Sequence, residues 1–180
     1  KKLSLPKDFV LYVGDVTWNK NLPGLIEAVS NTGFHLVIAG EAFTNDSFDR
    51  NNPWNKDLSR SQNLAKQNKR IISTGFVDND DLVSLYNAAK LFVMPSFYEG
   101  FGLPVLEAMQ SGCPVVTSKK GSLPEVAGES AYFVDPNDIT AIEKGIKEVM
   151  ESSTLRQKLR KLGLEQAKKF TWEKTANETM

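Results

Sequence analysis

The sequence has one cysteine, Cys113, and one histidine, His35, among its 180 residues. A single cysteine cannot form an internal disulfide, which favours a reducing compartment. Because Cys113 lies at the start of an apolar segment, we interpret it as a small buried residue rather than a reactive thiol. His35 stands alone at the start of a predicted strand, which favours a structural role and disfavours a metal site.

The chain also has no net charge, because its 22 Lys and Arg residues balance its 22 Asp and Glu residues. This balance disfavours general electrostatic binding to nucleic acid, although a local basic patch is not excluded. We interpret the basic cluster Arg156–Lys161 as a solvated helix face. No apolar run approaches the roughly 20 residues needed to cross a bilayer, and no signal peptide is visible. We therefore expect a cytoplasmic protein.

The sequence does have the composition of an ordinary globular domain, with 41% hydrophobic and 24% charged residues. Its apolar runs are short and continuous rather than alternating, which is typical of parallel strands covered on both faces. Segments with helical periodicity separate nearly all of them. These patterns predict an α/β fold: a Rossmann-like, doubly wound, mostly parallel six-stranded sheet with helices on both faces, forming one domain over residues 1–180. The strands are expected at residues 9–13, 36–39, 70–73, 91–94, 114–117 and 131–134.

One stretch, residues 41–55, has no clear period and is expected to be a long loop. Ligands of doubly wound sheets bind at the carboxyl ends of the strands, where the strand order reverses. Gly14, Gly40, Gly75 and the loop after Pro95 follow predicted strands, so we expect them around one crevice.

The loop after Pro95 has the composition of an anion site. Gly100 and Gly102 allow close approach of the backbone to a ligand, and Pro104 suits the first turn of a helix. The N–H groups of Gly102, Leu103 and Val105 would then face a phosphate.

Three charged side chains flank the predicted crevice. Glu107, early in the helix, could accept hydrogen bonds from a ribose diol or only complement the helix dipole. Glu99 precedes the glycines and could face a ligand or be a solvated loop carboxylate. Lys20 is expected to open the first helix, where it opposes the dipole unless an anionic ligand is present.

Five motifs occur in order and together carry a resemblance. They are Gly14-x5-Lys20-Asn21, Gly75-Phe76-Val77, Pro95-Ser-x-x-Glu99-Gly-Phe-Gly-Leu-Pro-x-x-Glu107-Ala, Gly112-x-Pro114-Val-Val and Gly121-x-x-Pro124-Glu125. Over essentially its whole length the chain resembles the C-terminal, donor-binding domain of retaining GT-B glycosyltransferases of the group 1 family. The Glu-x7-Glu element is the specific part, and the shorter motifs alone would be weak.

The resemblance implies an enzyme that moves a hexosyl group from a nucleoside-diphosphate sugar, with UDP or GDP as the nucleotide, without a metal or other cofactor. It implies catalytic roles for Glu99, near the anomeric centre, and for Lys20, which neutralises the diphosphate. Glu107 would bind the ribose hydroxyls. The donor-binding set as a whole is Gly14, Lys20, Phe76, Val77, Glu99, Gly100, Phe101, Gly102, Leu103 and Glu107.

Two departures from the family pattern affect these expectations. Asp15 stands where many relatives have an arginine that clamps the diphosphate. The family's N-terminal, acceptor-binding domain is not in the sequence, so we expect the chain alone to bind a donor but to transfer poorly. Residues 171–180, around Trp172, resemble the helix that crosses to that domain. The acceptor would be a glycan, a lipid or a small molecule, and a lipid-linked sugar would imply peripheral association at the inner face of the membrane.

Other functions stay open at this point. They are a non-catalytic sugar-nucleotide-binding module, a GT-B-fold sugar-nucleotide epimerase and a phosphorylase, although no lysine has the context of a pyridoxal phosphate site. A dehydrogenase is disfavoured, because Gly14-Asp-Val-Thr-Trp lacks the glycine spacing of a dinucleotide fingerprint.

Overall fold

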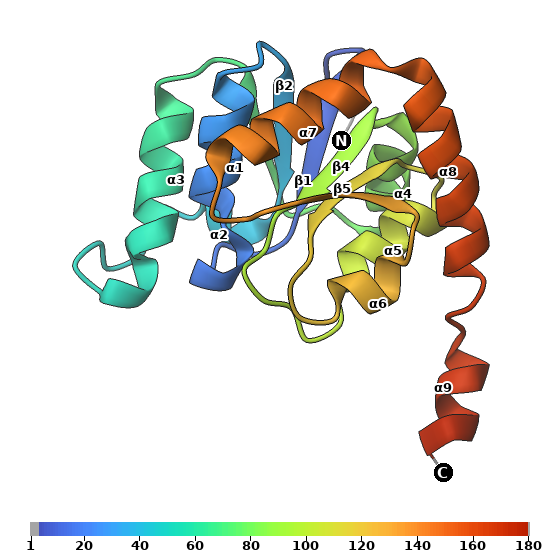
Figure 1. Cartoon of the computed structure of the whole chain (residues 1–180). Coiled ribbons are helices and arrows are strands. Elements are labelled where there is room, and N and C mark those ends of the chain that lie inside the picture. The colour runs from blue at the N-terminus through green and yellow to red at the C-terminus, as the bar shows by residue number, and fades with distance from the viewer. Residues whose placement is uncertain (1–3, 180) are drawn as a thin grey trace.

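Six strands form a single sheet in which every neighbouring pair is parallel. The computed structural model describes residues 4–179 (Figure 1). The strand order is β3-β2-β1-β4-β5-β6, so the order reverses between β1 and β4. This confirms the predicted Rossmann-like sheet. The strands are β1 (Phe9–Val13), β2 (His35–Ala39), β3 (Ile71–Gly75), β4 (Leu91–Met94), β5 (Val115–Ser118) and β6 (Ala131–Val134).

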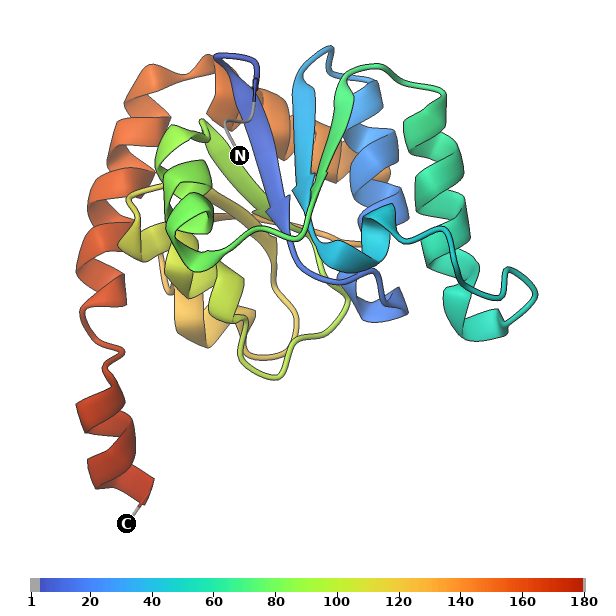
Figure 2. The same cartoon turned by 180° about the vertical axis from the view of Figure 1, so that it is seen from behind.

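Helices cover both faces of the sheet, which explains why its central strands β1 and β4 are continuous apolar runs (Figures 1 and 2). Val10 and Tyr12 of β1 pack in one core with α1, α3 and α7. Phe9 and Leu11 point to the other core, with α4, α5 and α6. The helices are α1 (Leu22–Ser30), α2 (Glu41–Thr44), α3 (Lys56–Lys66), α4 (Asn79–Ala88), α5 (Leu103–Gln110), α6 (Leu123–Ala127), α7 (Ile139–Glu151), α8 (Ser153–Ala167) and α9 (Trp172–Thr179), with 3₁₀ turns η1 (Trp18–Lys20) and η2 (Pro53–Asn55).

The prediction of a continuous loop over residues 41–55 was wrong. The segment contains α2 and η2, both shorter than the window in which helical periodicity can be recognised. Side chains fix these turns: Gln62 of α3 donates to the carbonyls of Phe43 and Asn45, both at 3.0 Å. The Asn52 side chain caps η2 by accepting the Trp54 N–H at 3.0 Å.

The last helix, α9, extends away from the rest of the chain, past the carboxyl edge of the sheet (Figures 1 and 2). A helix was expected over residues 171–180; Met180 lies outside the described residues. Residues 172–178 are all exposed, and the Trp172 side chain is among the most exposed large hydrophobic groups. Within residues 4–179, no helix has the length and hydropathy needed to cross a membrane.

Candidate active site

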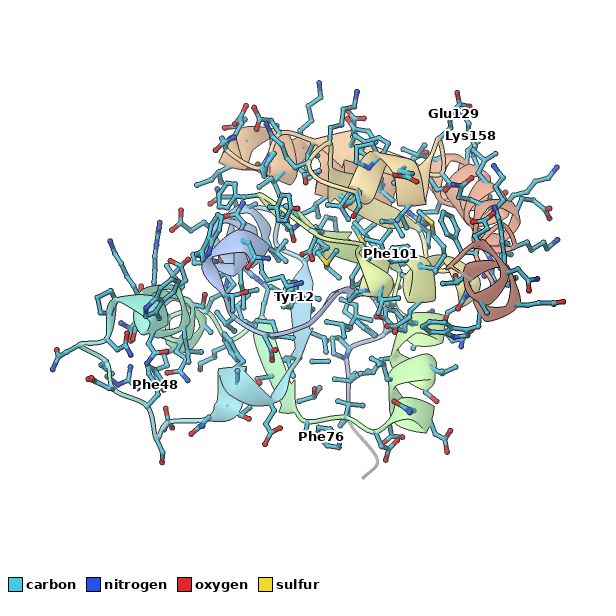
Figure 3. All side chains as sticks on the ribbon, turned by 90° about the horizontal axis from the view of Figure 1, so that it is seen from below. Tyr12, Phe48, Phe76, Phe101, Glu129 and Lys158 are labelled. Atoms are coloured by element: carbon cyan, nitrogen blue, oxygen red, sulfur yellow. The ribbon has the colours of Figure 1, made fainter. Side chains whose placement is uncertain are left out.

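The loops that follow β1 and β4 meet at the point where the strand order reverses. The Phe97 N–H donates to the Asn19 carbonyl at 2.7 Å, and Asn19 Nδ2 donates to the Tyr98 carbonyl at 3.1 Å. Figure 3 looks onto this edge of the sheet, with Tyr12 of β1 near its centre and Phe76 on its rim. Hydrogen bonds therefore join two of the loops that were expected around the crevice.

Lys20 and Glu99 form an ion pair between these two loops. Lys20 Nζ lies 2.8 Å from Glu99 Oε1 and 2.9 Å from Oε2, and Ser96 Oγ donates to Oε1 at 2.7 Å. Only 19% of the Lys20 side chain and 8% of the Glu99 side chain are exposed. The alternative of a solvated loop carboxylate at Glu99 is therefore wrong, and sequence reasoning missed Ser96.

The expectation that Lys20 opens the first helix was wrong. It is the last residue of η1, and α1 begins at Leu22 after the intervening Asn21. The reason is the backbone of Asn21, which adopts a left-handed conformation at φ 53°. A helix cannot continue through that conformation, so η1 ends before Asn21 and α1 begins after it. A cation at the end of η1 no longer opposes the dipole of that turn.

Asn21 belongs to a motif found in the sequence, but no role was predicted for it. It is buried, and its Nδ2 donates to the carbonyls of Pro95 at 3.2 Å and Pro136 at 2.7 Å. These bonds join the loops after β1, β4 and β6 directly beside Lys20. The available signal was the residue type, since asparagine is one of the few residues that tolerates the left-handed region.

Gly102 precedes the first residue of α5 with φ 92°, a conformation that favours glycine. A Cβ there would lie 2.7 Å from Leu123 Cδ2, so the Leu123 side chain would have to shift to admit one. The Val105 N–H donates to the Gly102 carbonyl at 2.9 Å. The prediction that the Val105 N–H faces a ligand was therefore wrong, because the first helical turn already uses it.

The loop after β5 is hydrogen-bonded to the backbone of the Glu99 segment. The Ser122 N–H donates to the Glu99 carbonyl at 3.2 Å, and the single hydroxyl proton is shared between the Phe101 carbonyl, at 2.7 Å, and the Glu99 carbonyl, at 3.2 Å. A Cβ at Gly121 would lie 2.4 Å from the Glu99 carbonyl oxygen. Gly121 thus permits the loop after β5 to lie close to the Glu99 backbone. The role of Ser122 was not predicted, because its partners are more than 20 residues away in the sequence.

Glu107, the other carboxylate of the motif, lies in the second turn of α5. Tyr86 of α4 donates its hydroxyl to Glu107 Oε2 at 2.9 Å. Burial raises the pKa of Tyr86 well above its ordinary range, and the Glu107 charge acts in the same direction. Glu107 lines a cavity of about 450 Å³ together with Phe101, Leu103 and Trp172. Its carboxylate therefore has a fixed orientation at a cavity wall.

Comparison with known proteins identifies the family. A family model described as "Glycosyl transferases group 1" matches residues 1–166. The chain belongs to this family. The predicted family is confirmed, and with it the fold of the C-terminal domain of GT-B glycosyltransferases.

Individual relatives agree with this assignment. O-antigen chain mannosyltransferase B of Escherichia coli is 37% identical, over 96% of this chain and 44% of that protein. Sucrose-phosphate synthase of Thermosynechococcus elongatus is 28% identical with a TM-score of 0.85, over 97% of this chain and 45% of that one. The C-terminal domain of a glycosyl transferase group 1 family protein of Francisella tularensis is 29% identical with a TM-score of 0.71, over 89% of this chain and 85% of that one. The chain thus spans less than half the length of the mannosyltransferase.

A smaller cavity of about 150 Å³ lies at the carboxyl ends of β1 and β2, on the side of β1 away from β4. It is lined by Gly14, Phe76 and Val77 with residues of β2 and α4, so the structure brings these three predicted residues together. Phe76 is 75% exposed, whereas Val77 packs partly into the core. The predicted site residues thus form three neighbouring groups along the carboxyl edge: Gly14 with Phe76 and Val77, Lys20 with Glu99, and Glu107 with Phe101 and Leu103.

Tyr12 fixes the turn after β1 from inside the core. Its hydroxyl donates to the Asp15 carbonyl at 2.7 Å, and burial raises its pKa far above the ordinary value, with the Glu99 and Asp15 charges adding to the shift. The Asp15 side chain, at the position where the resemblance predicts an arginine, is exposed. In the part of the chain that the structure describes, no group of three His, Cys, Asp or Glu side chains is arranged to hold a metal ion.

Proposed function

We propose that this domain binds the donor of a retaining glycosyltransferase, which moves a hexosyl group from a nucleoside-diphosphate sugar to an acceptor. The observation that carries the proposal is the Lys20–Glu99 ion pair at the carboxyl ends of β1 and β4. Ligands of doubly wound sheets bind at such a reversal of strand order. Membership of the group 1 family supports the choice of a sugar nucleotide as the ligand.

Lys20 binds the diphosphate in this proposal. An ammonium group has three N–H donors, and two of the hydrogen bonds from Nζ go to Glu99. The remaining donor can reach a phosphate oxygen while Glu99 keeps the side chain in place. Lys20 then stabilises the negative charge that develops on the leaving diphosphate, as preorganised charges do in other transferases.

Glu99 binds hydroxyl groups of the donor sugar near the anomeric carbon. Its carboxylate is held by Lys20 and Ser96, so it presents its remaining lone pairs without reorganisation. When the bond from the anomeric carbon to the phosphate oxygen breaks, the electron pair leaves with the diphosphate. The acceptor oxygen then adds on the same face and gives its proton to the departing diphosphate oxygen, and addition on that face retains the configuration.

The nucleoside occupies the two flanking groups of residues. Glu107, oriented by Tyr86, accepts hydrogen bonds from the ribose hydroxyls. The backbone of residues 100–103 binds the sugar and diphosphate, and Phe76 and Val77 bind the base beside Gly14. The donor is a UDP- or GDP-sugar, and the name of the Escherichia coli relative favours mannose as the sugar.

The acceptor is a glycan or lipid-linked sugar of a polysaccharide pathway, bound by a second domain at the cytoplasmic face of a membrane. Relatives more than twice as long as this chain support a two-domain enzyme, in which α9 packs on the acceptor domain. The 180 residues alone then bind donor but show little turnover. Robust transfer by this chain alone would contradict that division of roles.

The experiment that tests catalysis is a transfer assay on the two-domain enzyme with Glu99→Ala. A glycosyltransferase loses transfer while nucleotide binding through Glu107 and the base persists. If wild-type protein binds donors but transfers no sugar to any acceptor, the domain is a binding module instead.

A further inference from the structure

A second charged cavity lies at the opposite end of the sheet from Lys20 and Glu99, where α7 meets α8 (Figure 1). Its volume is about 240 Å³, and its walls come from the ends of α4 and α5 and from the first turns of α8. Three cationic side chains line it, namely Lys90, Arg156 and Arg160. No carboxylate is among the described residues that line it, although the chain as a whole has no net charge.

Arg156 is held rigidly at this cavity by the end of α7. Its Nη1 donates to the carbonyls of Val149, at 2.8 Å, and Met150. Both bonds use one nitrogen, and a guanidinium has five N–H donors in a fixed plane. The remaining donors keep an orientation suited to a planar or tetrahedral oxyanion.

Arg160 follows Arg156 by one helical turn, so the two like charges face the same side of α8. Its guanidinium lies against Gly112, where a Cβ would be 3.1 Å from Arg160 Nε. Gly112, at φ 68°, therefore serves two purposes: it ends α5 and leaves room for the arginine. Lys90, from the other wall, is paired with Asp8 at 2.8 Å, and the Asp8 carboxylate also interacts with Arg156, so it offsets part of the positive charge.

A solvated basic helix face does not account for this arrangement. The cations come from segments about 65 residues apart in sequence and converge on one cavity, whereas Lys158 and Lys161 of the same helix lie outside its lining. Ser153 and Gln157 add neutral hydrogen-bonding groups. The amino-terminal end of the 15-residue helix α8 adds a partial positive charge.

We propose that this cavity binds a phosphate-bearing anion, separately from the donor at the carboxyl edge. Sites for drug-sized ligands occupy about 300–1,000 Å³. The smaller volume here suits a phosphate or diphosphate group rather than a whole nucleotide. The group belongs to a small phosphorylated molecule or to an anionic lipid headgroup, since both present the same oxyanion.

A residue-resolved NMR titration with inorganic pyrophosphate tests the proposal, because it separates this cavity from the Lys20 site. The amide signals of Gly112, Ser153 and Gln157 are expected to shift, and the shifts weaken with added salt. Arg160→Gln is expected to weaken binding at these signals at least about tenfold. The matched control is Lys158→Gln, which removes the same charge from the same helix outside the cavity and leaves binding unchanged.

A second variant protects the test against a misfolded Arg160→Gln protein. Gln157→Glu introduces a carboxylate at an exposed lining position and is expected to abolish the shifts, with an unchanged circular dichroism spectrum. The absence of shifts at the cavity in wild-type protein would overturn the proposal. Equal weakening by Arg160→Gln and Lys158→Gln would also overturn it, because diffuse surface charge then explains the binding.

Vesicles distinguish the two sources of the phosphate. Arg160-dependent binding to vesicles containing phosphatidylglycerol, but not to pure phosphatidylcholine vesicles, identifies a lipid headgroup as the ligand. Pyrophosphate binding without vesicle binding identifies a soluble phosphorylated molecule.

Discussion

The Glu99 carboxylate accepts three hydrogen bonds, two from Lys20 and one from Ser96, while 8% of its side chain is exposed. A carboxylate so deep in a protein is costly unless it is paired. The pair therefore does two things at once: it joins the loops after β1 and β4, and it fixes both proposed catalytic groups. Stability and function are linked at these two residues.

Lys20→Met is expected to lower the free energy of unfolding by about 3 kcal/mol, because it leaves Glu99 buried without its cation. Glu99→Gln alone costs less, since Gln keeps polar contacts with Ser96 and Lys20 remains partly exposed. Urea unfolding of both single variants and the double variant gives a coupling energy of at least about 1 kcal/mol. A coupling energy near zero would mean that the pair does not hold the loops together.

Asp15 offers a gain-of-function test. Asp15→Arg is expected to tighten binding of UDP or GDP by about fivefold to tenfold, because an arginine can bind the diphosphate with two parallel hydrogen bonds. The fold is unaffected, since Tyr12 binds the backbone carbonyl of residue 15 and not its side chain. Calorimetric titration checks the affinity. Asp15→Asn is the control that removes only the carboxylate charge. An equal gain in affinity from both variants would mean that the gain comes from removing the repulsion between Asp15 and the diphosphate, and not from new arginine hydrogen bonds.

Cys113 predicts a pH dependence of stability. Burial raises the pKa of its thiol to about 12, above its ordinary value near 9. The unfolded chain therefore releases this proton at lower pH than the folded chain, so the stability contributed by the buried thiol is lost as pH rises above about 9. Between pH 7 and 9.5 the wild type should lose about 1 kcal/mol of unfolding free energy that Cys113→Ala does not lose. Parallel pH profiles for the two proteins would contradict the burial of the thiol.

At the scale of elements, the site depends on how closely four loops approach one another. Asn21 joins the loops after β1, β4 and β6, and Ser122 joins those after β4 and β5. The strands and the helices flanking them could be predicted because each has its own apolar pattern. The joining residues could not, because their roles depend on partners far away in the sequence. The turns α2 and η2 were missed for another reason, their short length, and the start of α1 was misplaced because the left-handed backbone of Asn21 separates η1 from α1.

Two glycines of these loops provide a matched pair of variants. Gly121→Ala is expected to cost at least about 2 kcal/mol, because its φ is 56° and a Cβ would meet the Glu99 carbonyl. Gly100→Ala is expected to change stability by less than about 0.5 kcal/mol, since a Cβ there meets no atom within 4 Å. Gly100→Ala should instead weaken donor binding, because the added methyl group faces the proposed ligand. Urea unfolding and calorimetry together check both, and equal effects of the two variants on stability would contradict the loop geometry.

At the scale of the whole molecule, the chain is a parallel sheet with a carboxyl edge that carries every predicted site residue. The motifs identified the family and the edge, since both follow from the order of strands and glycines along the chain. The basic cavity at the opposite edge was not predicted, because Lys90 joins Arg156 and Arg160 only after folding. The two edges give the domain one proposed site for a donor and another for a phosphate-bearing anion.

The central claim is that a nucleoside-diphosphate sugar binds across the carboxyl edge of this sheet. A residue-resolved NMR titration of the 180-residue chain with UDP-glucose, GDP-mannose and an ADP-sugar tests it most directly. Saturable shifts are expected with at least one of these donors at the amides of Gly14, Lys20, Val77, Gly100 and Glu107. The Lys20→Met variant is expected to bind that donor more weakly. Binding of none of the three, or shifts confined to other surfaces, would contradict it.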